Sequence, residues 1–139
     1  MAKYDAFGTA LYKGTTTGTV YAQVTSISGP GLSLDVEDVT SHDSTGGWEE
    51  VVATILRSGE ISMDLVYDPA NATHKNSAGG LLYDLVSRTA ITVTLVFPDT
   101  ATTEWTFSAY VVSFEPSAPH DGALTASVTL KPTGSMTIV

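Results

Sequence analysis

The chain contains no cysteine, and this absence removes several kinds of chemistry at once. Disulfides, thiolate nucleophiles and cysteine-ligated zinc sites are all excluded. The sequence also lacks any run that approaches the roughly 18 consecutive apolar residues of a membrane span. Its first residues, MAKYDAFG, have none of the apolar core that a signal peptide needs. We therefore expect no membrane association, and either a cytosolic protein or a particle assembled from cytosolic protein.

Basic residues are scarce as well, with 6 Lys and Arg against 15 Asp and Glu and a formal net charge of −9. Ordinary nucleic-acid binding requires Lys and Arg to neutralise phosphates, so this balance argues against it. A surface that DNA passes without sticking remains compatible with the charge. Improved solubility is the simpler explanation of the acidity.

The 139 residues, 42% of them hydrophobic, are enough for one domain over residues 1–139 with a core of its own. Apolar and polar residues alternate in several short segments, which is typical of half-buried strands. Leu81, Leu82, Leu85 and Val86 instead share one helical face, and they predict a helix over about residues 74–87. We expect a mainly β fold, an antiparallel β-sandwich or open barrel of about seven or eight strands with one lateral α-helix. The expected strands cover residues 9–13, 20–25, 32–37, 60–67, 91–97, 104–111 and 124–131, with a short tail strand over 136–139.

A long excursion separates the alternating segments at 32–37 and 60–67. It spans roughly twenty residues, whereas a hairpin loop needs only about two to five. Trp48, Val51, Val52, Ile55 and Leu56 give it an apolar content that disordered segments lack. We interpret residues 41–57 as an arm that docks on another copy of the same protein.

Catalytic and metal sites find little support. His42, Asp43 and Ser44 are the residue types of a hydrolytic triad, but triads are assembled from distant segments and not from neighbours. The three histidines stand in three different segments, and the acids near residue 35 lack the spacing of a calcium loop. We expect no enzyme activity, no metal and no cofactor. The side chains considered for metals are His42, His74, His120, Asp43 and Asp121, and for calcium Asp35, Glu37 and Asp38.

Trp48, Glu49 and Glu50 form the most informative local group. A tryptophan flanked by charges at the end of an arm resembles an interface anchor. The alternative is that the arm folds back and Trp48 joins the core of its own chain. The sequence alone leaves both interpretations open.

Acidic residues also recur on the polar faces of the two strands that flank the arm. If these strands pair, Asp35, Glu37, Glu60 and Asp64 come together on one face. Like charges opposite one another destabilise a sheet, so a sequence that keeps them has a use for an acidic surface. The alternative is a register that separates the charges, with water screening the remainder.

The order of these motifs resembles the tail tube (major tail) proteins of long-tailed bacteriophages. The resemblance lies in DVTSHDS (38–44), GWEE (47–50), RSGEI (57–61) and YDP (67–69) followed by a short helix. GTALYKG (8–14) and SGP (28–30) are similar to the same family. It therefore covers about half of the chain in detail and all of it in element order.

That resemblance implies a β-sandwich or barrel subunit, six copies of which form a ring whose inner strands make one continuous barrel. Rings stack into a hollow virion tail tube, made from protein synthesised in the host cytoplasm, through which DNA passes without specific binding. Implied partners are other copies, a tail tip or initiator complex, a tape measure protein and a tail terminator. The residues assigned to contacts between subunits are His42, Asp43, Trp48, Glu49, Glu50 and Arg57. The candidates for the lumen are Asp35, Glu37, Glu60 and Asp64.

Two other functions stay open. Inner-tube proteins of contractile injection systems share the implied fold. A carbohydrate- or cell-surface-binding β-sandwich module, from a different class, would use Trp48, Trp105 and the acids as a platform for sugars. Assembly discriminates between the classes, because a binding module works as a monomer or small oligomer and a tube protein must form rings.

Overall fold

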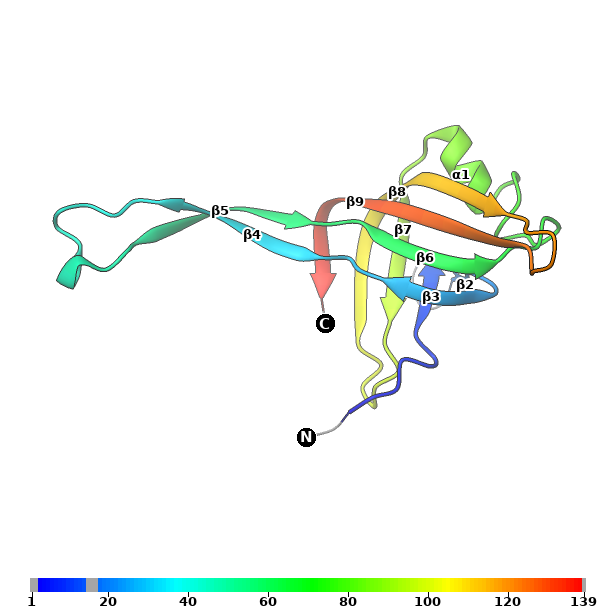
Figure 1. The fold of residues 1–139 in the computed structure, drawn as a ribbon, viewed down its shortest axis with the longest axis horizontal. Helices are drawn as coiled ribbons and strands as arrows, with labels where there is room; N and C mark the ends of the chain where they lie inside the picture. The colour runs from blue at the N-terminus through cyan, green and yellow to red at the C-terminus, as the bar shows by residue number, and fades with distance from the viewer. Residues whose placement is uncertain (1–2, 15–17, 139) are drawn as a thin grey trace.

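The computed structural model describes residues 3–14 and 18–138, in which nine strands and one α-helix are arranged around a curled sheet (Figure 1). Seven strands form this antiparallel sheet in the order β2-β1-β7-β8-β9-β6-β3, and the other two, β4 and β5, pair only with each other. The strands are β1 (Ala10–Lys13), β2 (Thr19–Val20), β3 (Val24–Ser28), β4 (Leu32–Asp38), β5 (Val51–Ser58), β6 (Ile61–Val66), β7 (Ile91–Val96), β8 (Glu104–Ser117) and β9 (Thr125–Ile138).

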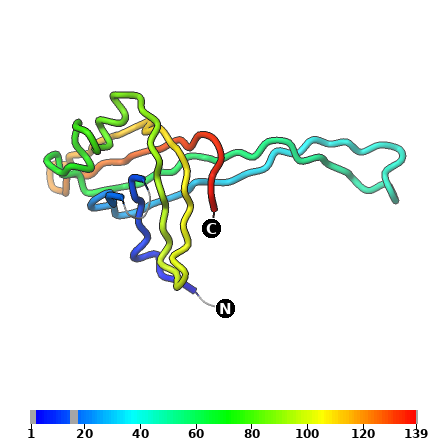
Figure 2. Tube along the Cα trace, turned by 180° about the vertical axis from the view of Figure 1, so that it is seen from behind, coloured from blue at the N-terminus to red at the C-terminus, as the bar shows by residue number. Residues whose placement is uncertain are grey.

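The sheet curls into a half-barrel because its two longest strands, β8 and β9, take part in both of its halves. Figures 1 and 2 show β7 and the first part of β8 running across the direction of β9, β6 and β3. Apolar side chains fill the inside of the curl, as on β6, where Ile61, Met63 and Leu65 are buried between exposed Ser62 and Asp64. The expected mainly β fold, with one helix and an open barrel, is confirmed.

The helix α1 (Leu81–Ser87) is shorter than the predicted helix over 74–87. Turns and bends occupy residues 72–80, and they bring Gly80 so close to the Lys75 carbonyl oxygen that only a glycine fits there. His74, fully buried, anchors this segment: its Nδ1 accepts the Asp68 N–H at 3.2 Å and its Nε2 bonds the Ala22 carbonyl oxygen at 2.8 Å. No helix in the described part of the chain is long and apolar enough to cross a membrane.

The pairing of the strands around the long excursion differs from the expectation. The segment beginning at Leu32 does not pair with the segment beginning at Ile61; β4 pairs with β5, while β6 pairs with β3 and β9. The reason is a pair of breaks that face each other, one at residues 29–31 and one at 59–60. The Gly59 N–H donates to the Gly31 carbonyl oxygen at 2.6 Å between them. Residues 24–66 therefore form one long hairpin with a break in each strand.

The last strand is longer than predicted. Sequence reasoning ends it at Lys131 and adds a tail strand over 136–139, but β9 runs through Pro132 to Ile138, and Val139 lies outside the described residues. A bend with Gly134 at a φ of 77° shifts the register, after which pairing with β8 resumes at Met136 and Phe107. Pro132 does not end the strand: it still lies opposite Ala109, just before the bulge at which the ladder is interrupted.

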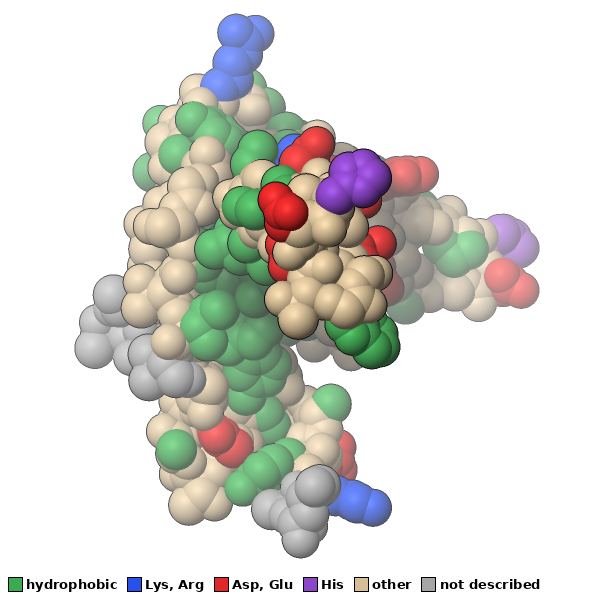
Figure 3. All heavy atoms as spheres, turned by 90° about the vertical axis from the view of Figure 1, so that its left-hand side faces the viewer, with side chains coloured by type: hydrophobic (Ala, Val, Ile, Leu, Met, Phe, Trp, Pro, Cys, Tyr) green, Lys and Arg blue, Asp and Glu red, His purple; other side chains and the backbone are tan. Residues whose placement is uncertain are grey.

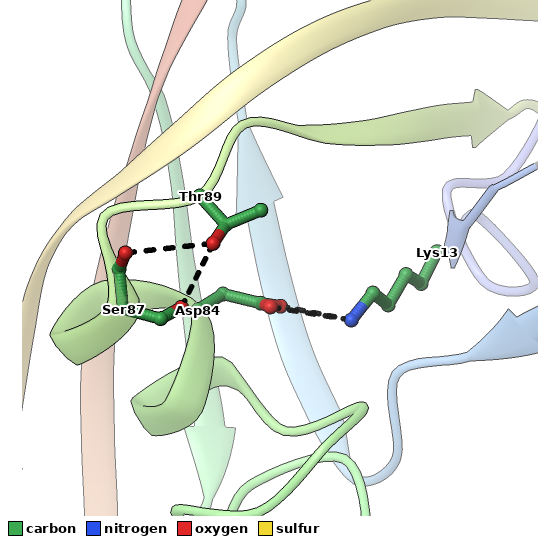
Figure 4. A network of polar contacts seen from close by, with 4 residues as sticks. All are labelled: Lys13, Asp84, Ser87 and Thr89. Atoms are coloured by element: carbon green, nitrogen blue, oxygen red, sulfur yellow. Dashed lines mark hydrogen bonds and ion pairs between the residues drawn. The ribbon is translucent and has the colours of Figure 1, made fainter.

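A partly buried ion pair holds the helix on the sheet (Figure 4). Lys13 Nζ on β1 lies 3.0 Å from Asp84 Oδ2 on α1, and the Asp84 side chain is only 3% exposed. Ser87 and Thr89 bond each other at the end of the helix, with 3.0 Å between their hydroxyl oxygens. Burial, followed by the negative charge of Asp84, raises the pKa of the neighbouring Tyr21 hydroxyl, which therefore stays protonated.

We expect Lys13→Ala to lower the free energy of unfolding by about 3 kcal/mol, because it leaves the Asp84 carboxylate buried without its partner. Replacing both residues, as Lys13→Met with Asp84→Leu, should cost less, since no buried charge remains. Urea denaturation followed by circular dichroism measures both, with the exposed Lys75→Ala as control, expected within about 0.5 kcal/mol of the parent. Equal losses in the single and double variants would show that the pair does not hold the helix.

Candidate assembly surfaces

The arm, residues 32–58, is a two-stranded ribbon that projects from the half-barrel (Figure 1). Its strands β4 and β5 pair from Leu32 opposite Ser58 to Asp38 opposite Val51. The ribbon therefore begins nearer the sheet than the predicted loop at 41–57, and only its last part is irregular. An isolated two-stranded hairpin is marginally stable in water, so this ribbon needs a further contact.

The two faces of the arm differ in polarity. Residues directly opposite each other in an antiparallel pair lie on the same face, and a register shift after Leu34 keeps Val36 opposite Ala53 just as Leu34 lies opposite Leu56. The opposite face carries Ser33, Asp35 and Glu37, with one apolar residue, Val52, opposite Glu37, and there Arg57 Nε lies 2.6 Å from Asp35 Oδ2. Most of the apolar face is exposed, to 81% at Leu56. That face, called here the apolar arm face, carries Leu32, Leu34, Val36, Val51, Ala53 and Leu56, with Ser58 and Asp38 at its two ends.

The tip of the arm is ordered by its own hydrogen bonds. Thr40 Oγ1 accepts the Glu50 N–H at 2.8 Å, and Ser44 Oγ accepts the Ser41 N–H at 3.0 Å. Hydrogen bonds from the side chain and backbone of Thr40 hold the pKa of Asp38 below its usual range. A 3₁₀ turn over Thr45–Gly47 then leads into Trp48. The tip is a defined shape and does not have to be ordered on binding, which lowers the entropic cost of docking.

Trp48 lies at this tip and is 77% exposed. Its indole ring runs alongside Gly46, where an added Cβ would lie 3.2 Å from Trp48 Cδ1. The arm does not fold back onto the core, so the second interpretation of Trp48 does not hold for the single chain. A tryptophan exposed at the end of a projecting ribbon is the kind of side chain that anchors protein interfaces.

The other predicted contact residues are distributed along the same arm. Arg57 lies at its base, on the polar face, and the remainder lie around the tip, all of them exposed. Those at the tip are His42, Asp43, Glu49 and Glu50.

A second surface is the outer face, the solvent side of β3, β6, β9 and the second part of β8. The register aligns Ser26, Asp64, Ser127 and Glu115 in one row across these four strands. Asp64 accepts hydrogen bonds from Ser26 Oγ at 3.1 Å and from Ser127 Oγ at 2.9 Å. The next row carries only hydroxyl side chains, those of Ser28, Ser62, Thr129 and Ser113.

Sequence reasoning missed Glu115. Alternation counted from Trp105 places odd-numbered residues of this strand inside, which would bury Glu115. A register shift between Val111 and Ser113 reverses the alternation, so that Phe114 packs against the core and Glu115 is exposed. The signal available in the sequence was the pair Phe114-Glu115, whose polarity contradicts the alternation of the residues before it.

The four predicted lumen candidates are not brought together. Asp35 and Glu37 lie on the arm, Glu60 lies at the break between β5 and β6, and Asp64 alone lies on the outer face. The prediction that they share a face fails because β4 and β6 do not pair. The four acidic charges are separated along the hairpin, which agrees with the alternative given in the sequence analysis.

The residues considered for catalysis and metal binding are also dispersed. Ser44 Oγ is taken up in the turn of the tip, and His42 and Asp43 are exposed beside it. His74 is buried near the sheet and His120 lies in the loop between β8 and β9. Among the described residues no group of three His, Asp or Glu side chains could hold a metal ion.

One protein family matches this chain. A family model described as phage tail tube protein matches residues 13–138, nearly the whole chain. No curated protein sequence is detectably similar to this chain.

Several solved structures share the fold. A chain in the virion of a native gene transfer agent particle matches with a TM-score of 0.77 and 15% identity, over 99% of both chains. A chain in the tail of an empty gene transfer agent particle, with C6 symmetry, matches with a TM-score of 0.76 and 15% identity, again over 99% of both chains. A chain of an extracellular contractile injection system, in its sheath-tube complex, matches with a TM-score of 0.69 and 16% identity. The match covers 99% of this chain and 93% of that one. At these identities the likeness shows the fold alone.

The exposure of Trp48 predicts that the two tryptophans respond differently to truncation. Trp48→Ala should change the free energy of unfolding of the monomer by less than about 0.5 kcal/mol. Trp105→Ala should cost about 3 kcal/mol, because Trp105 packs on the core with its ring 5.5 Å from that of Phe97. Thermal or urea unfolding of dilute protein measures both, and a large loss from Trp48→Ala would mean that the arm packs on its own domain.

Proposed function

Because this chain belongs to the phage tail tube protein family, we propose that six copies of it close into a ring and that such rings stack into a hollow tube. The chain is a structural subunit of a virion tail. The number six is supported by the C6 symmetry of the gene transfer agent tail, whose chain has the same fold. Closed rings and open stacks both arise from contacts between unlike surfaces of identical subunits.

The observation that carries the assembly is the apolar arm face. Leu32, Leu34, Val36 and Leu56 are about half exposed or more, on a ribbon that pairs with no strand of its own sheet. Each apolar side chain of this size is worth on the order of 2 kcal/mol when it leaves water. Docking this face on a neighbouring copy supplies the contact that the isolated hairpin lacks.

The outer face is the proposed wall of the lumen. Its two rows of serine and threonine carry Asp64 and Glu115 and are polar and negatively charged, and Lys131 is the next outward residue of β9 beyond them. DNA phosphates are repelled by such a surface and find no Lys or Arg on these rows to release their counterions. Genome passage without specific binding follows from this chemistry. Of the four lumen candidates taken from the sequence, we retain Asp64 and assign Asp35 and Glu37 to the arm.

The ends and the interior of the tube require other proteins. A tail tip or initiator complex would start the stack, a tape measure protein would occupy the lumen during assembly, and a terminator would close the last ring. Related folds occur in the baseplate and in the tube-terminating cap of the anti-feeding prophage, which supports partners at both ends.

Removal of the arm tip should abolish assembly and spare the fold. A chain lacking residues 44–50 should keep its circular dichroism spectrum, because these residues contribute no apolar side chain to the core. It should form no tubes by negative-stain electron microscopy and should remain small by light scattering. A chain with the same seven positions replaced by Gly and Ser separates loss of length from loss of side chains. Normal tubes from the deleted chain would refute the role of the arm.

Charge reversal on the outer face should make the tube retain DNA. Asp64→Lys with Glu115→Lys leaves the fold intact, because both side chains are exposed. Tubes of this variant should bind short duplex DNA in a salt-dependent manner, measured by co-sedimentation at 50 and 200 mM salt, while parent tubes bind none. The control, Asp5→Lys with Asp121→Lys, makes the same change in net charge away from that face. Equal retention by both variants would argue against an outer-face lumen.

A further inference from the structure

The base of the arm contains a small apolar notch. Its volume is about 230 Å³, and Arg57 and Ser58 lie on its rim. Figure 3, which looks along the arm from its tip, shows hydrophobic side chains gathered in a hollow beside it. Drug-sized ligands need pockets of roughly 300–1,000 Å³, so this base notch suits a single large side chain. Its apolar lining consists of Leu32, Leu56, Met136 and Ile138.

The tip of the arm carries only negative charge, whereas its base carries both signs, with Lys131 and with Arg57 paired to Asp35. Around the notch, Arg57 is 59% exposed, and Lys131 Nζ donates to the Ser58 carbonyl oxygen at 3.2 Å. These are two of only six Lys and Arg residues in the chain. The stretch 38–56 at the other end contains neither Lys nor Arg. Its four acids are Asp38, Asp43, Glu49 and Glu50.

The tip cannot reach the notch of its own chain. The eight residues of β5 alone, at about 3.3 Å each, separate tip and base by on the order of 25 Å. Strand pairing along the whole ribbon prevents it from folding back. An acidic tip with one exposed indole and an apolar notch with Arg57 and Lys131 near it can therefore meet only between two copies.

We propose that Trp48 of one copy seats in the base notch of the next copy, with Glu49 and Glu50 beside that copy's Arg57 and Lys131. This inference rests on the tube assembly proposed above and names the donor and the acceptor of one contact in it. The indole fills the apolar notch, while Arg57, held by Asp35 on the polar face of the arm, contributes its charge beside it. Opposite charges set the register and accelerate encounter.

The contact also has a direction. Tip and base are unlike surfaces, so each copy donates one tip and accepts one, which generates a chain of contacts without a two-fold axis. Both partner surfaces lie on the arm or directly at its base. The same ribbon thus links each copy to two others.

Because the chain contains no cysteine, two introduced cysteines are the only residues that can form disulfides in a cross-linking test. A chain with Trp48→Cys and Ser135→Cys, in which Ser135 lines the notch, is assembled under reducing conditions and then oxidised. A ladder of covalent multimers on a non-reducing gel is expected. The matched control, Trp48→Cys with Ser87→Cys on the exposed end of α1, should give no ladder. Tubes without the ladder in the first variant would overturn the proposal.

Fluorescence covers the case in which the cysteine variant does not assemble. In a Trp105→Phe chain, Trp48 is the only tryptophan. Its emission should shift to the blue on assembly, and acrylamide quenching should fall several-fold. Adding Ser135→Tyr fills the notch and should abolish this shift, whereas Ser87→Tyr should not. An unchanged shift with a filled notch overturns the docking.

Electron microscopy of the same samples separates the two levels of the proposal. Tubes in which Trp48 stays quenchable leave the tube assembly standing and overturn the docking alone. Failure of the unmodified chain to form rings or tubes, alone and with its initiator complex, overturns the tube assembly, and the docking with it.

Discussion

A two-stranded ribbon with one apolar face is the constraint on which the rest of this structure depends. Two strands cannot bury a face by themselves, and the half-barrel leaves the ribbon uncovered. Leu56 at 81% and Trp48 at 77% exposure are costly in water and are compensated only when a neighbour covers them. The single chain therefore has a buried core of its own but leaves the apolar residues of its arm exposed to water. These apolar side chains are buried only when the copies assemble.

The half-barrel fulfils the opposite requirement, because it must be stable before any neighbour arrives. Its core is closed by strands distant in sequence, with β8 and β9 shared between both halves of the sheet. The helix adds an apolar cover at Leu81 and an ion pair to β1 through Asp84. Rigid support at the base of the arm directs the ribbon away from the domain. The arm can then present its tip at a defined distance from the sheet.

Sequence reasoning was sufficient where local patterns decide the structure. Period-two alternation identified most strands, and the length of the segment between 37 and 60 identified the arm. It failed where contacts distant in sequence decide. The pairing of β4 with β5 depends on two facing breaks at residues 29–31 and 59–60, and a bulge in β8 brings Glu115 to the outer face. The predicted helix was too long at its N-terminal end, because the pattern of apolar residues did not show that His74 is buried in a turn.

The distribution of charge connects these surfaces to one another. A net charge of −9 read from composition alone suggests a uniformly acidic protein. The structure instead distributes it unevenly: only acids occupy the arm tip, Asp64 and Glu115 lie on the outer face, and Lys131 and the Asp35-paired Arg57 lie near the arm base. Uniform acidity would make copies repel one another at every surface. Separation along the arm allows repulsion toward DNA on one face and attraction between copies at another, so a single acidic chain can form both the wall of a tube and its joints.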